Sequence, residues 1–194
     1  MTKSKALKQS EAFGYLKINE VLLLQKYAED MPKNGVCVNI GAGFGTSSLS
    51  VLEVRSDLRD TFYTIDIRND DNPFGGLLNE RNAFKKSDME HPNQIHGDSK
   101  AVADIWKHRK IDLLIIDGDH TEEGCRGDIL KWEKHLKEGA IVFVHDYQSR
   151  HWAEVTRVVN EEMFDSPKYT YLEKSSIDGK GCYVIFKYNG KAEE

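Results

Sequence analysis

The sequence predicts an α/β protein, a Rossmann-like three-layer sandwich built on a mostly parallel sheet of seven strands. From residue 36 onward, short apolar segments alternate with segments of helical periodicity, which favours parallel strands joined by helices. Acidic residues follow the apolar segments, where parallel strands end at a common edge of the sheet. The last two apolar segments, 168–174 and 181–188, flank the turn signal Asp178-Gly179 and predict a C-terminal antiparallel hairpin.

The length and charge of the chain limit what it can be. At 194 residues we expect one domain, with an N-terminal helical or lid segment at 1–34, a core at 35–189 and a charged tail at 190–194. The net charge is −5, whereas nucleic-acid-binding proteins usually present a basic face, so we expect no nucleic acid as a partner. The chain opens without a secretory leader pattern, and no apolar run approaches the ~20 residues of a membrane span. We therefore expect a cytoplasmic protein with no membrane partner.

The three cysteines are expected to be structural. Cys37, Cys125 and Cys182 lie far apart, show no metal-ligand spacing and sit in apolar stretches. Buried thiols in a reducing compartment explain this pattern. The sequence carries no signal from which an oligomeric state can be predicted.

The first predicted element is a helix over 20–29, for which Asn19 can serve as the N-cap. Apolar residues recur along one side of this segment, so the helix can pack on a face of the sheet. Alternatively, together with Phe13-Gly14-Tyr15, it folds over a ligand site as a lid.

The first predicted strand, 36–40, runs into a turn that contains three alternate glycines. Gly41, Gly43 and Gly45 remove every second Cβ atom, so that a ligand can lie against bare backbone. The helix expected over 46–53 points its N-terminal N–H groups at the same place. Dinucleotides and S-adenosylmethionine are two ligand classes that use such a turn. The dinucleotide fingerprint G-x-G-x-x-G places its third glycine one residue later, so the spacing here leans away from a pyrophosphate, and a tight turn without any ligand is the other interpretation.

The second predicted strand, 61–67, ends at an acid. Asp66 follows the glycines by about 20 residues, which places its carboxylate to accept both hydroxyls of a ribose, although a single Asp at a strand end is also a common turn former. A long connection to residue 94 then contains a short predicted helix over 77–86, and its length suggests a mobile flap beside the ribose site.

The third apolar segment, 94–99, precedes a predicted helix over 100–108. Asp98 or Ser99 can cap that helix, or both can lie beside an adenine, with the carboxylate accepting from the exocyclic amine.

The second half of the chain continues the alternation. We expect a buried strand over 111–116, a helix over 121–137 that Gly139 ends, and a strand over 140–144. A further helix is expected over 151–163. Trp132, at helical spacing with other apolar residues, is expected in the core.

Acidic and histidine residues gather at the ends of the fourth and fifth predicted strands. Asp117, Asp119 and His120 follow one strand, and His145 and Asp146 follow the next. Carboxylates with imidazoles suit one divalent ion, and a histidine with a pKa near neutrality suits a general base. Alternatively, Asp119 or Thr121 simply caps the helix that begins there.

Together these motifs resemble those of class I S-adenosylmethionine-dependent methyltransferases. The glycine turn at 39–45, Asp66, the G-D-S segment at 97–99 and the strand ending in Asp117 appear in the family's order. Within the class, I-D-G-D-H at 116–120 followed by V-H-D-Y is similar to small O-methyltransferases of sugars and natural products, many of them metal-dependent. The resemblance covers nearly the whole chain from residue 36 onward.

The resemblance implies S-adenosylmethionine as cofactor, transfer of its methyl group to a hydroxyl of a small molecule or sugar, and Mg or Mn as a divalent metal. The implied cofactor-binding residues are Asn39, Gly41, Ala42, Gly43, Gly45, Thr46, Ser47, Asp66, Ile67, Asp98, Ser99 and Asp117. The implied metal ligands are Asp117, His145 and Asp146, and the implied catalytic residues are Asp119, His120 and His145.

The chain departs from the family's pattern at two of these positions. Asn39 and His145 stand where the family usually has acids, and imidazole suits Mn, Fe or Zn better than Mg. These departures favour an alternative, a non-catalytic or regulatory module that binds the same cofactor. A nicotinamide-dependent enzyme is a third hypothesis, but it requires a glycine in place of Thr46 and a sixth parallel strand, and the sequence provides neither.

Overall fold

The computed structural model describes residues 4–13, 15–70, 73–175 and 182–190, and their contacts divide the chain into two compact units, residues 1–98 and 99–194. The expectation of a single domain stays a prediction. The predicted turn at Asp178-Gly179, Gly14, two residues of the long connection and the end of the tail lie outside the described residues.

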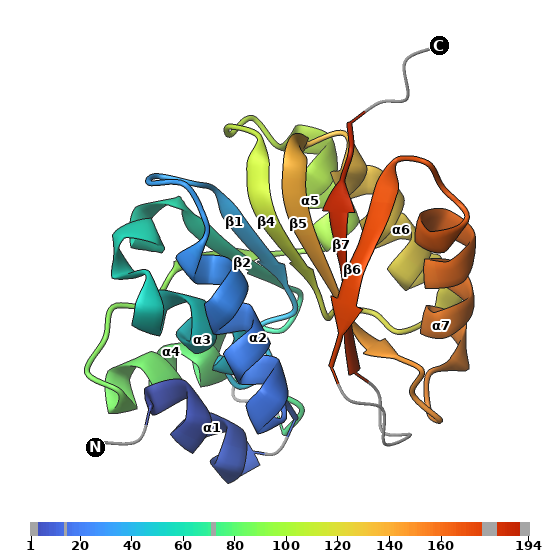
Figure 1. Ribbon diagram of the computed structural model, residues 1–194. Helices are drawn as coiled ribbons and strands as arrows, with labels where there is room; N and C mark the ends of the chain where they lie inside the picture. Colours follow the sequence, from blue (N-terminus) through green and yellow to red (C-terminus); the bar gives the residue numbers. More distant parts are fainter. Residues whose placement is uncertain (1–3, 14, 71–72, 176–181, 191–194) are drawn as a thin grey trace. The chain divides into compact units, whose positions relative to one another are not determined.

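The first unit combines three parallel strands with four helices (Figure 1). The strands lie in the order β3-β2-β1, and Asn39 is paired with Thr64 in their register. The elements are α1 (Lys5–Phe13), α2 (Ile18–Glu29), β1 (Cys37–Ile40), α3 (Thr46–Val54), the 3-10 helix η1 (Ser56–Thr61), β2 (Phe62–Asp66), α4 (Leu77–Lys86) and β3 (Asn93–His96). Helices α1 and α2 pack on α3, while α4 packs on α3 and β2. The helix predicted over 77–86 is confirmed.

Distant and local carboxylates determine where the first two helices begin. Helix α1 lies in the segment predicted as helical or lid, but its bounds were not predicted. Ser4 Oγ accepts from Leu7 N at 3.3 Å, and the distant Glu53 carboxylate accepts from Lys5 N at 2.6 Å and Ala6 N at 3.1 Å. Helix α2 begins before the predicted position, because Glu20 Oε2 accepts from Lys17 N at 2.8 Å. The prediction of Asn19 as the N-cap was therefore wrong, and Asn19 lies inside the helix.

The second unit carries the remaining described strands, in the order β4-β5-β7-β6. Strands β4 and β5 are parallel, whereas β7 is antiparallel to both β5 and β6, so the predicted C-terminal hairpin is confirmed. The elements are α5 (Ser99–Ile105), β4 (Ile111–Ile116), α6 (Glu122–Glu133), β5 (Leu136–Tyr147), α7 (Ala153–Val159), the π-helix η2 (Asn160–Phe164), β6 (Tyr169–Lys174) and β7 (Cys182–Tyr188).

The predicted boundary between the long helix and the fifth strand was wrong. Helix α6 ends at Glu133, and β5 begins at Leu136, which is paired with Ile111 before the register shifts. Gly139, expected to end the helix, has a φ of +86° inside the strand. The strand can begin early because Lys137 forms an ion pair with Asp112 at 3.0 Å, which accommodates charged residues at its exposed start. Helix α5 is likewise shorter than predicted, and α7 begins two residues later and continues as a π-helix.

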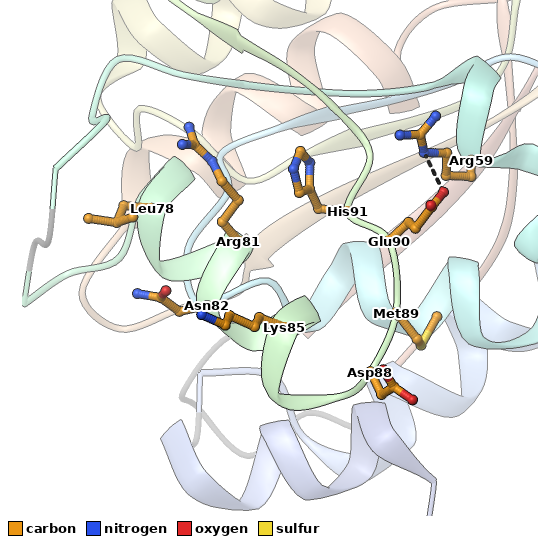
Figure 2. Close-up of a pocket in the computed structure, with 9 residues that line it drawn as sticks. All are labelled: Arg59, Leu78, Arg81, Asn82, Lys85, Asp88, Met89, Glu90 and His91. Atoms are coloured by element: carbon orange, nitrogen blue, oxygen red, sulfur yellow. Dashed lines mark ion pairs between the residues drawn. The ribbon is translucent and has the colours of Figure 1, made fainter.

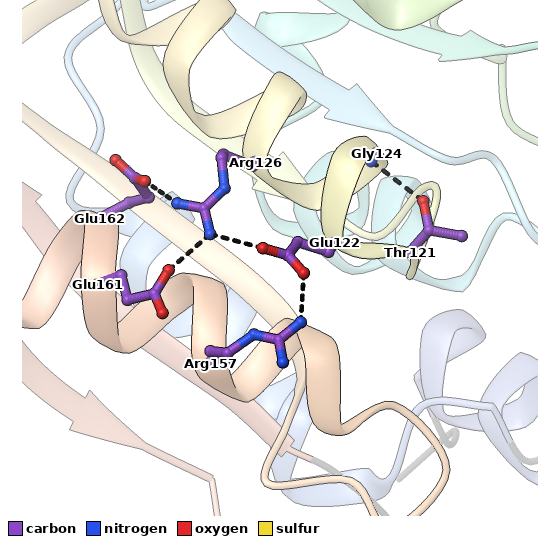
Figure 3. Close-up of polar contacts among 7 residues, drawn as sticks. All are labelled: Thr121, Glu122, Gly124, Arg126, Arg157, Glu161 and Glu162. Carbon is purple, nitrogen blue, oxygen red and sulfur yellow. Dashed lines mark hydrogen bonds and ion pairs between the residues drawn. The ribbon is translucent and has the colours of Figure 1, made fainter.

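Charged side chains join α6 to α7 and the π-helix (Figure 3). The Arg126 guanidinium contacts Glu122 at 3.1 Å, Glu161 at 2.5 Å and also Glu162. Glu122 forms a second ion pair with Arg157. A network of several charges stabilises such a surface more than isolated pairs do.

The predicted core residues are buried. Trp132 and Cys37 are fully buried, as is Cys182, and Cys125 is 2% exposed. The described cysteines are all free thiols, as expected. Among the described residues, every helix is too short or too polar to cross a lipid bilayer.

Candidate functional site

The glycine turn of the first unit has the backbone geometry that the sequence predicts. Gly41, Gly43 and Gly45 have φ angles of +92°, +50° and +80°, a region that side-chain-bearing residues rarely adopt. A Cβ atom at Gly43 would have no neighbour within 4 Å, so open space lies beside the turn. Gly45 precedes α3 and offers no side-chain cap to its first N–H groups, which belong to the buried residues Thr46 and Ser47. A ligand can therefore approach bare backbone here.

Asp66 lies at the end of β2 against this turn. Its Oδ2 accepts from the backbone N–H of Ala42 at 2.9 Å, and its Oδ1 accepts from Arg68 N at 2.8 Å. The Asp66 side chain is only 3% exposed. Since a carboxylate offers about four acceptor positions, it retains capacity for further donors such as ribose hydroxyls. Next to it, Ile67 is an exposed apolar residue.

The long connection after Asp66 returns to the glycine turn. Gly76 N donates to Gly43 O at 2.8 Å, and a Cβ atom at Gly75 would lie 2.4 Å from the carbonyl carbon of Gly43. Leu77 N also donates to Arg68 O at 3.0 Å. The segment predicted as a flap thus contacts the turn directly at its glycine pair.

The N-terminal segment contacts the same turn through Phe44. Gln9 Nε2 donates to Phe44 O at 2.6 Å. The ring of Phe44 stacks on Phe13, with centroids 4.2 Å apart, and on Tyr15 at 5.3 Å. Gln9, Phe13 and Tyr15 thus contact the turn, and their role as a lid stays a prediction. In contrast, helix α2 packs on α3 instead of the expected face of the sheet.

A buried polar network beneath the turn was not predicted from the sequence. Glu80 of α4 is fully buried, and its carboxylate accepts from Ser48 Oγ at 2.5 Å, Thr64 Oγ1 at 2.9 Å and Gln94 Nε2 at 2.7 Å. Burial disfavours the charged form more than these donors favour it, which raises the pKa of Glu80 to about 7. Its partners come from three other elements, so no local sequence pattern could have indicated this network.

The segment after β3 also lies beside Asp66. Gly97 N donates to the backbone oxygen of Asp66 at 3.0 Å, so the segment that contains Asp98 begins beside the end of β2. Ser99 begins α5, and its hydroxyl donates to the buried carboxylate of Asp128. This bond is consistent with a structural role for Ser99 at the helix start.

In the second unit, four predicted residues come together at the ends of β4 and β5. His120 Nε2 lies 2.8 Å from Asp146 Oδ2 and 3.7 Å from Asp117 Oδ1. His145 Nδ1 lies 3.1 Å from Asp117 Oδ1 and 3.2 Å from Asp146 Oδ2. Among the described residues, Asp117, His120 and Asp146 offer ligand atoms that all lie within 4.8 Å of one another. This group contains His120, which the sequence analysis assigned to catalysis, in the place of His145, which it named as a metal ligand.

The charges of this cluster are strongly coupled. Burial alone would lower the pKa of His120, but Asp117 and Asp146 outweigh it and raise the pKa to about 9. Burial opposes ionisation of Asp117 and Asp146 as well, yet the two histidines hold the pKa of both carboxyls below the usual range. The cluster therefore keeps two ionised carboxylates in a half-buried position, where a cation is favoured.

The backbone and the aromatic residues around the cluster support a functional site. Asp146 has a φ of +58°, which is uncommon for a residue with a side chain and recurs at functional sites. The Trp152 ring stacks on His120, with centroids 4.8 Å apart, and Tyr183 contacts the edge of His145 at 4.6 Å. Trp152 is 42% exposed, so it can form one wall for an incoming molecule.

Asp119 lies apart from this cluster of ligand atoms. Its Oδ1 accepts from Thr121 N at 3.0 Å, and a Cβ atom at Gly124 would lie 2.4 Å from its carboxylate oxygen. Thr121 Oγ1 accepts from Gly124 N at 3.1 Å and caps α6. These contacts favour the capping interpretation for the segment over a direct catalytic role of Asp119.

A separate pocket of about 660 Å³ lies beside α4 in the first unit (Figure 2). Both basic and acidic side chains line it, and Arg59 forms an ion pair with Glu90 at 3.5 Å. None of the residues that line this pocket was predicted as a site residue. The pocket contains side chains of both charges, so it presents no strongly charged surface for a ligand. The candidate site therefore remains at the glycine turn and the cluster of Asp117, His120, His145 and Asp146.

Comparison with known proteins identifies a matching family and solved structures of similar fold. The profile of a family described as "Methyltransferase domain" matches residues 38–147, which is more than half of the chain. Three solved structures with similar folds are an O-methyltransferase of Bacillus cereus in complex with SAH, a protein of Staphylococcus aureus described as a caffeoyl-CoA O-methyltransferase, and one of Clostridium thermocellum described as an rRNA methylase.

These structures share the fold at low sequence identity. The B. cereus structure has a TM-score of 0.72 at 12% identity and covers 97% of this chain and 92% of its own. The S. aureus structure has a TM-score of 0.68 at 16% identity, with 96% and 93% covered. The C. thermocellum structure has a TM-score of 0.65 at 15% identity, with 89% and 100% covered. The predicted Rossmann-like α/β fold, with a mostly parallel seven-stranded sheet and an antiparallel C-terminal hairpin, is thereby confirmed.

Proposed function

The chain belongs to the methyltransferase domain family and is an S-adenosylmethionine-dependent methyltransferase, and from this premise we propose that it methylates a hydroxyl group of a small molecule or sugar. The observation that carries the proposal is the cluster of Asp117, His120, His145 and Asp146, whose carboxylates and imidazoles can activate a hydroxyl.

The residues of the glycine turn fit the proposed cofactor. The space beside Gly43 leaves room for the amino-acid end, and Asp66 retains acceptor positions for the ribose. Ile67 offers an apolar surface for the adenine, and Asn39 carries a buried carbonyl oxygen without a partner among the described residues. When bound, the cofactor supplies a methyl carbon that its sulfonium has already activated.

The second cluster fits a divalent cation. Asp117, Asp146 and either histidine would hold it, and this mixture of carboxylate oxygen and imidazole nitrogen suits Mn at least as well as Mg. Such an ion would lower the pKa of an acceptor hydroxyl. His145 can also take up the proton of the hydroxyl directly, whereas His120, whose pKa is raised to about 9, already carries a proton near neutral pH. Trp152 and Tyr183 limit how an acceptor can approach the two histidines.

The acidic composition supports a small acceptor. One of the similar structures is described as an rRNA methylase, so the fold itself does not distinguish between acceptor classes. The net charge of this chain is −5, and a nucleic-acid methylase needs a basic surface to bind phosphates. We therefore assign a small hydroxylated molecule or sugar as the partner.

The test is methyl transfer from radiolabelled S-adenosylmethionine to a panel of catechols, phenols and sugars, with MnCl2, MgCl2 or EDTA. Asp146→Asn is expected to lower the rate on the order of 100-fold, because general-base and metal contributions are at least that large. The affinity for S-adenosylhomocysteine, measured by calorimetry, should change less than threefold.

Asp112→Asn is the matched control for this substitution. Asp112 lies near the start of β4, away from the strand end that carries the cluster, and pairs with Lys137, so its replacement should leave methyl transfer unchanged. Equal rates in EDTA and in Mn would exclude the metal and leave the histidine base. If Asp146→Asn transfers methyl groups at the wild-type rate, the assigned catalytic cluster is wrong. If the protein binds the cofactor but methylates no acceptor, the non-catalytic module is supported instead.

A further inference from the structure

The buried amide of Asn39 has all its donors in use and its acceptor unused. Asn39 Nδ2 donates to Gly41 O at 3.0 Å and to Ser48 Oγ at 3.3 Å. Because a carbonyl can only accept, the bond to Gly41 O determines which end of the amide is the nitrogen. Asn39 Oδ1 is then left buried, with no partner among the described residues, in a side chain that is 0% exposed. A buried acceptor without a donor is costly and calls for a ligand that supplies one.

The hydroxyl group of Ser48 explains why the Asn39 amide has this orientation. Ser48 has one hydroxyl hydrogen, and Glu80 Oε1 accepts it. Ser48 Oγ can therefore meet Asn39 only as an acceptor, which requires the amide nitrogen on that side. An ionised carboxylate only accepts, so at pH values above the raised pKa of Glu80 this residue dictates the direction of every hydrogen bond in the chain from Glu80 to Asn39.

The position of Glu80 is itself held from several sides. Thr64 Oγ1 and Gln94 Nε2 donate to its two oxygens. Gln94 cannot reverse its amide easily, because Nε2 also donates to Leu77 O at 2.8 Å and Oε1 accepts from Arg81 Nε at 2.6 Å. The network therefore has one consistent arrangement of donors and acceptors.

We propose that Glu80 is a positioning residue which, through Ser48, holds the Asn39 amide with its carbonyl oxygen as a neutral acceptor for the ammonium group of S-adenosylmethionine. This inference rests on the cofactor assignment to the glycine turn. It explains how the chain can hold the ammonium although an uncharged residue stands where an acid is usual. Asn39 would contact the cofactor, whereas Glu80 acts only through Ser48 and Asn39.

A double-mutant cycle tests the proposal by binding. Calorimetric titrations at pH 8 would use S-adenosylhomocysteine, which carries the ammonium, and 5′-methylthioadenosine, which lacks the whole amino-acid end. The proteins are wild type, Asn39→Ala, Glu80→Gln and the double variant. Each single substitution is expected to weaken S-adenosylhomocysteine binding about tenfold, or about 1.4 kcal/mol, and to leave methylthioadenosine binding unchanged. In the Asn39→Ala background, Glu80→Gln should have no further effect.

Glu20→Gln is the matched control, because Glu20 is another buried glutamate of the same unit and accepts from Lys17 N in α2. It should change neither affinity. If Glu80→Gln does not fold, as judged by circular dichroism and thermal melting, Ser48→Ala replaces it with the same expected result.

Three outcomes would overturn the proposal in distinguishable ways. Additive effects of the two substitutions would show that Glu80 does not act through Asn39. Equal losses for both nucleosides would show a general structural role for Glu80. If the wild-type protein binds neither nucleoside, the cofactor assignment fails first, and the inference fails with it.

Discussion

At the residue scale, Asp66 combines a structural and a binding task. Its carboxylate accepts from Ala42 in the glycine turn and from Arg68, so it stabilises the turn even without a ligand. A bound ribose would use the acceptor positions that remain. This dual use explains why a nearly buried carboxylate can lie at a ligand site.

Replacing Asp66 by Asn should weaken cofactor binding by tenfold or more, because hydrogen bonds to a charged acceptor contribute about 1.5–3 kcal/mol. Calorimetric titration with S-adenosylhomocysteine measures the change. Asp60→Asn is the control, since the Asp60 side chain is exposed and forms an ion pair with the neighbouring Arg59. Unchanged affinity in Asp66→Asn would remove Asp66 from the ribose site.

Local motifs made part of the candidate site predictable. The glycines and Asp66 were found because strand ends and turns depend on residues close in sequence. The contacts of His120 with Asp117 and Asp146 could be expected only as a general cluster, since side-chain distances depend on packing. Glu80 was missed, because its partners come from α3, β2 and β3 and nothing in its own sequence neighbourhood indicates burial.

At the scale of elements, the type of most helices and strands was predictable and their ends were not. Periodicity indicated β4 and α4 at their observed bounds. The bounds of helix α1 were not predicted: Ser4 caps it locally, but the Glu53 carboxylate that binds its first N–H groups is distant in sequence. The end of α6 was misplaced because Gly139, a common helix terminator, instead provides a positive φ inside β5. Helix ends follow tertiary contacts that a local pattern does not contain.

The contact between the long connection and the glycine turn can be tested at Gly75. Alanine there would have a positive φ and a Cβ atom 2.4 Å from Gly43, so the connection should be displaced from the turn. Gly139→Ala is the control, because it has a similar φ of +86° but no neighbour within 4 Å of the added Cβ. In urea unfolding, the free energy of unfolding should fall by about 1 kcal/mol for the control and by clearly more for Gly75→Ala. Equal decreases in the two variants would mean that close packing of Gly75 against Gly43 does not contribute to stability.

At the scale of the whole molecule, Glu80 should make stability depend on pH. Its pKa is raised from 4.5 to about 7 in the folded protein by burial. Between these values the unfolded chain has released a proton that the folded chain keeps, so the free energy of unfolding falls as pH rises and levels off above 7. The shift corresponds to a change on the order of 3 kcal/mol.

The measurement is urea unfolding of wild type and Glu80→Gln at pH 5 and pH 8. The variant cannot titrate at this position, so its stability should fall less between the two pH values than that of the wild type. The comparison removes the contribution of the other titrating groups, which the two proteins share. Parallel pH profiles would show that Glu80 titrates normally in the folded state.

The distribution of buried thiols over the two units has a practical consequence. Cys37 lies in β1 of the first unit, whereas Cys125 and Cys182 lie in α6 and β7 of the second. Burial raises the pKa of Cys125 to about 12, so its thiolate is scarce while the structure is closed. An aromatic disulfide reagent can therefore modify each thiol only when its surroundings open. The rates of modification would act as native reporters that follow transient opening separately in each half of the enzyme, without an introduced label.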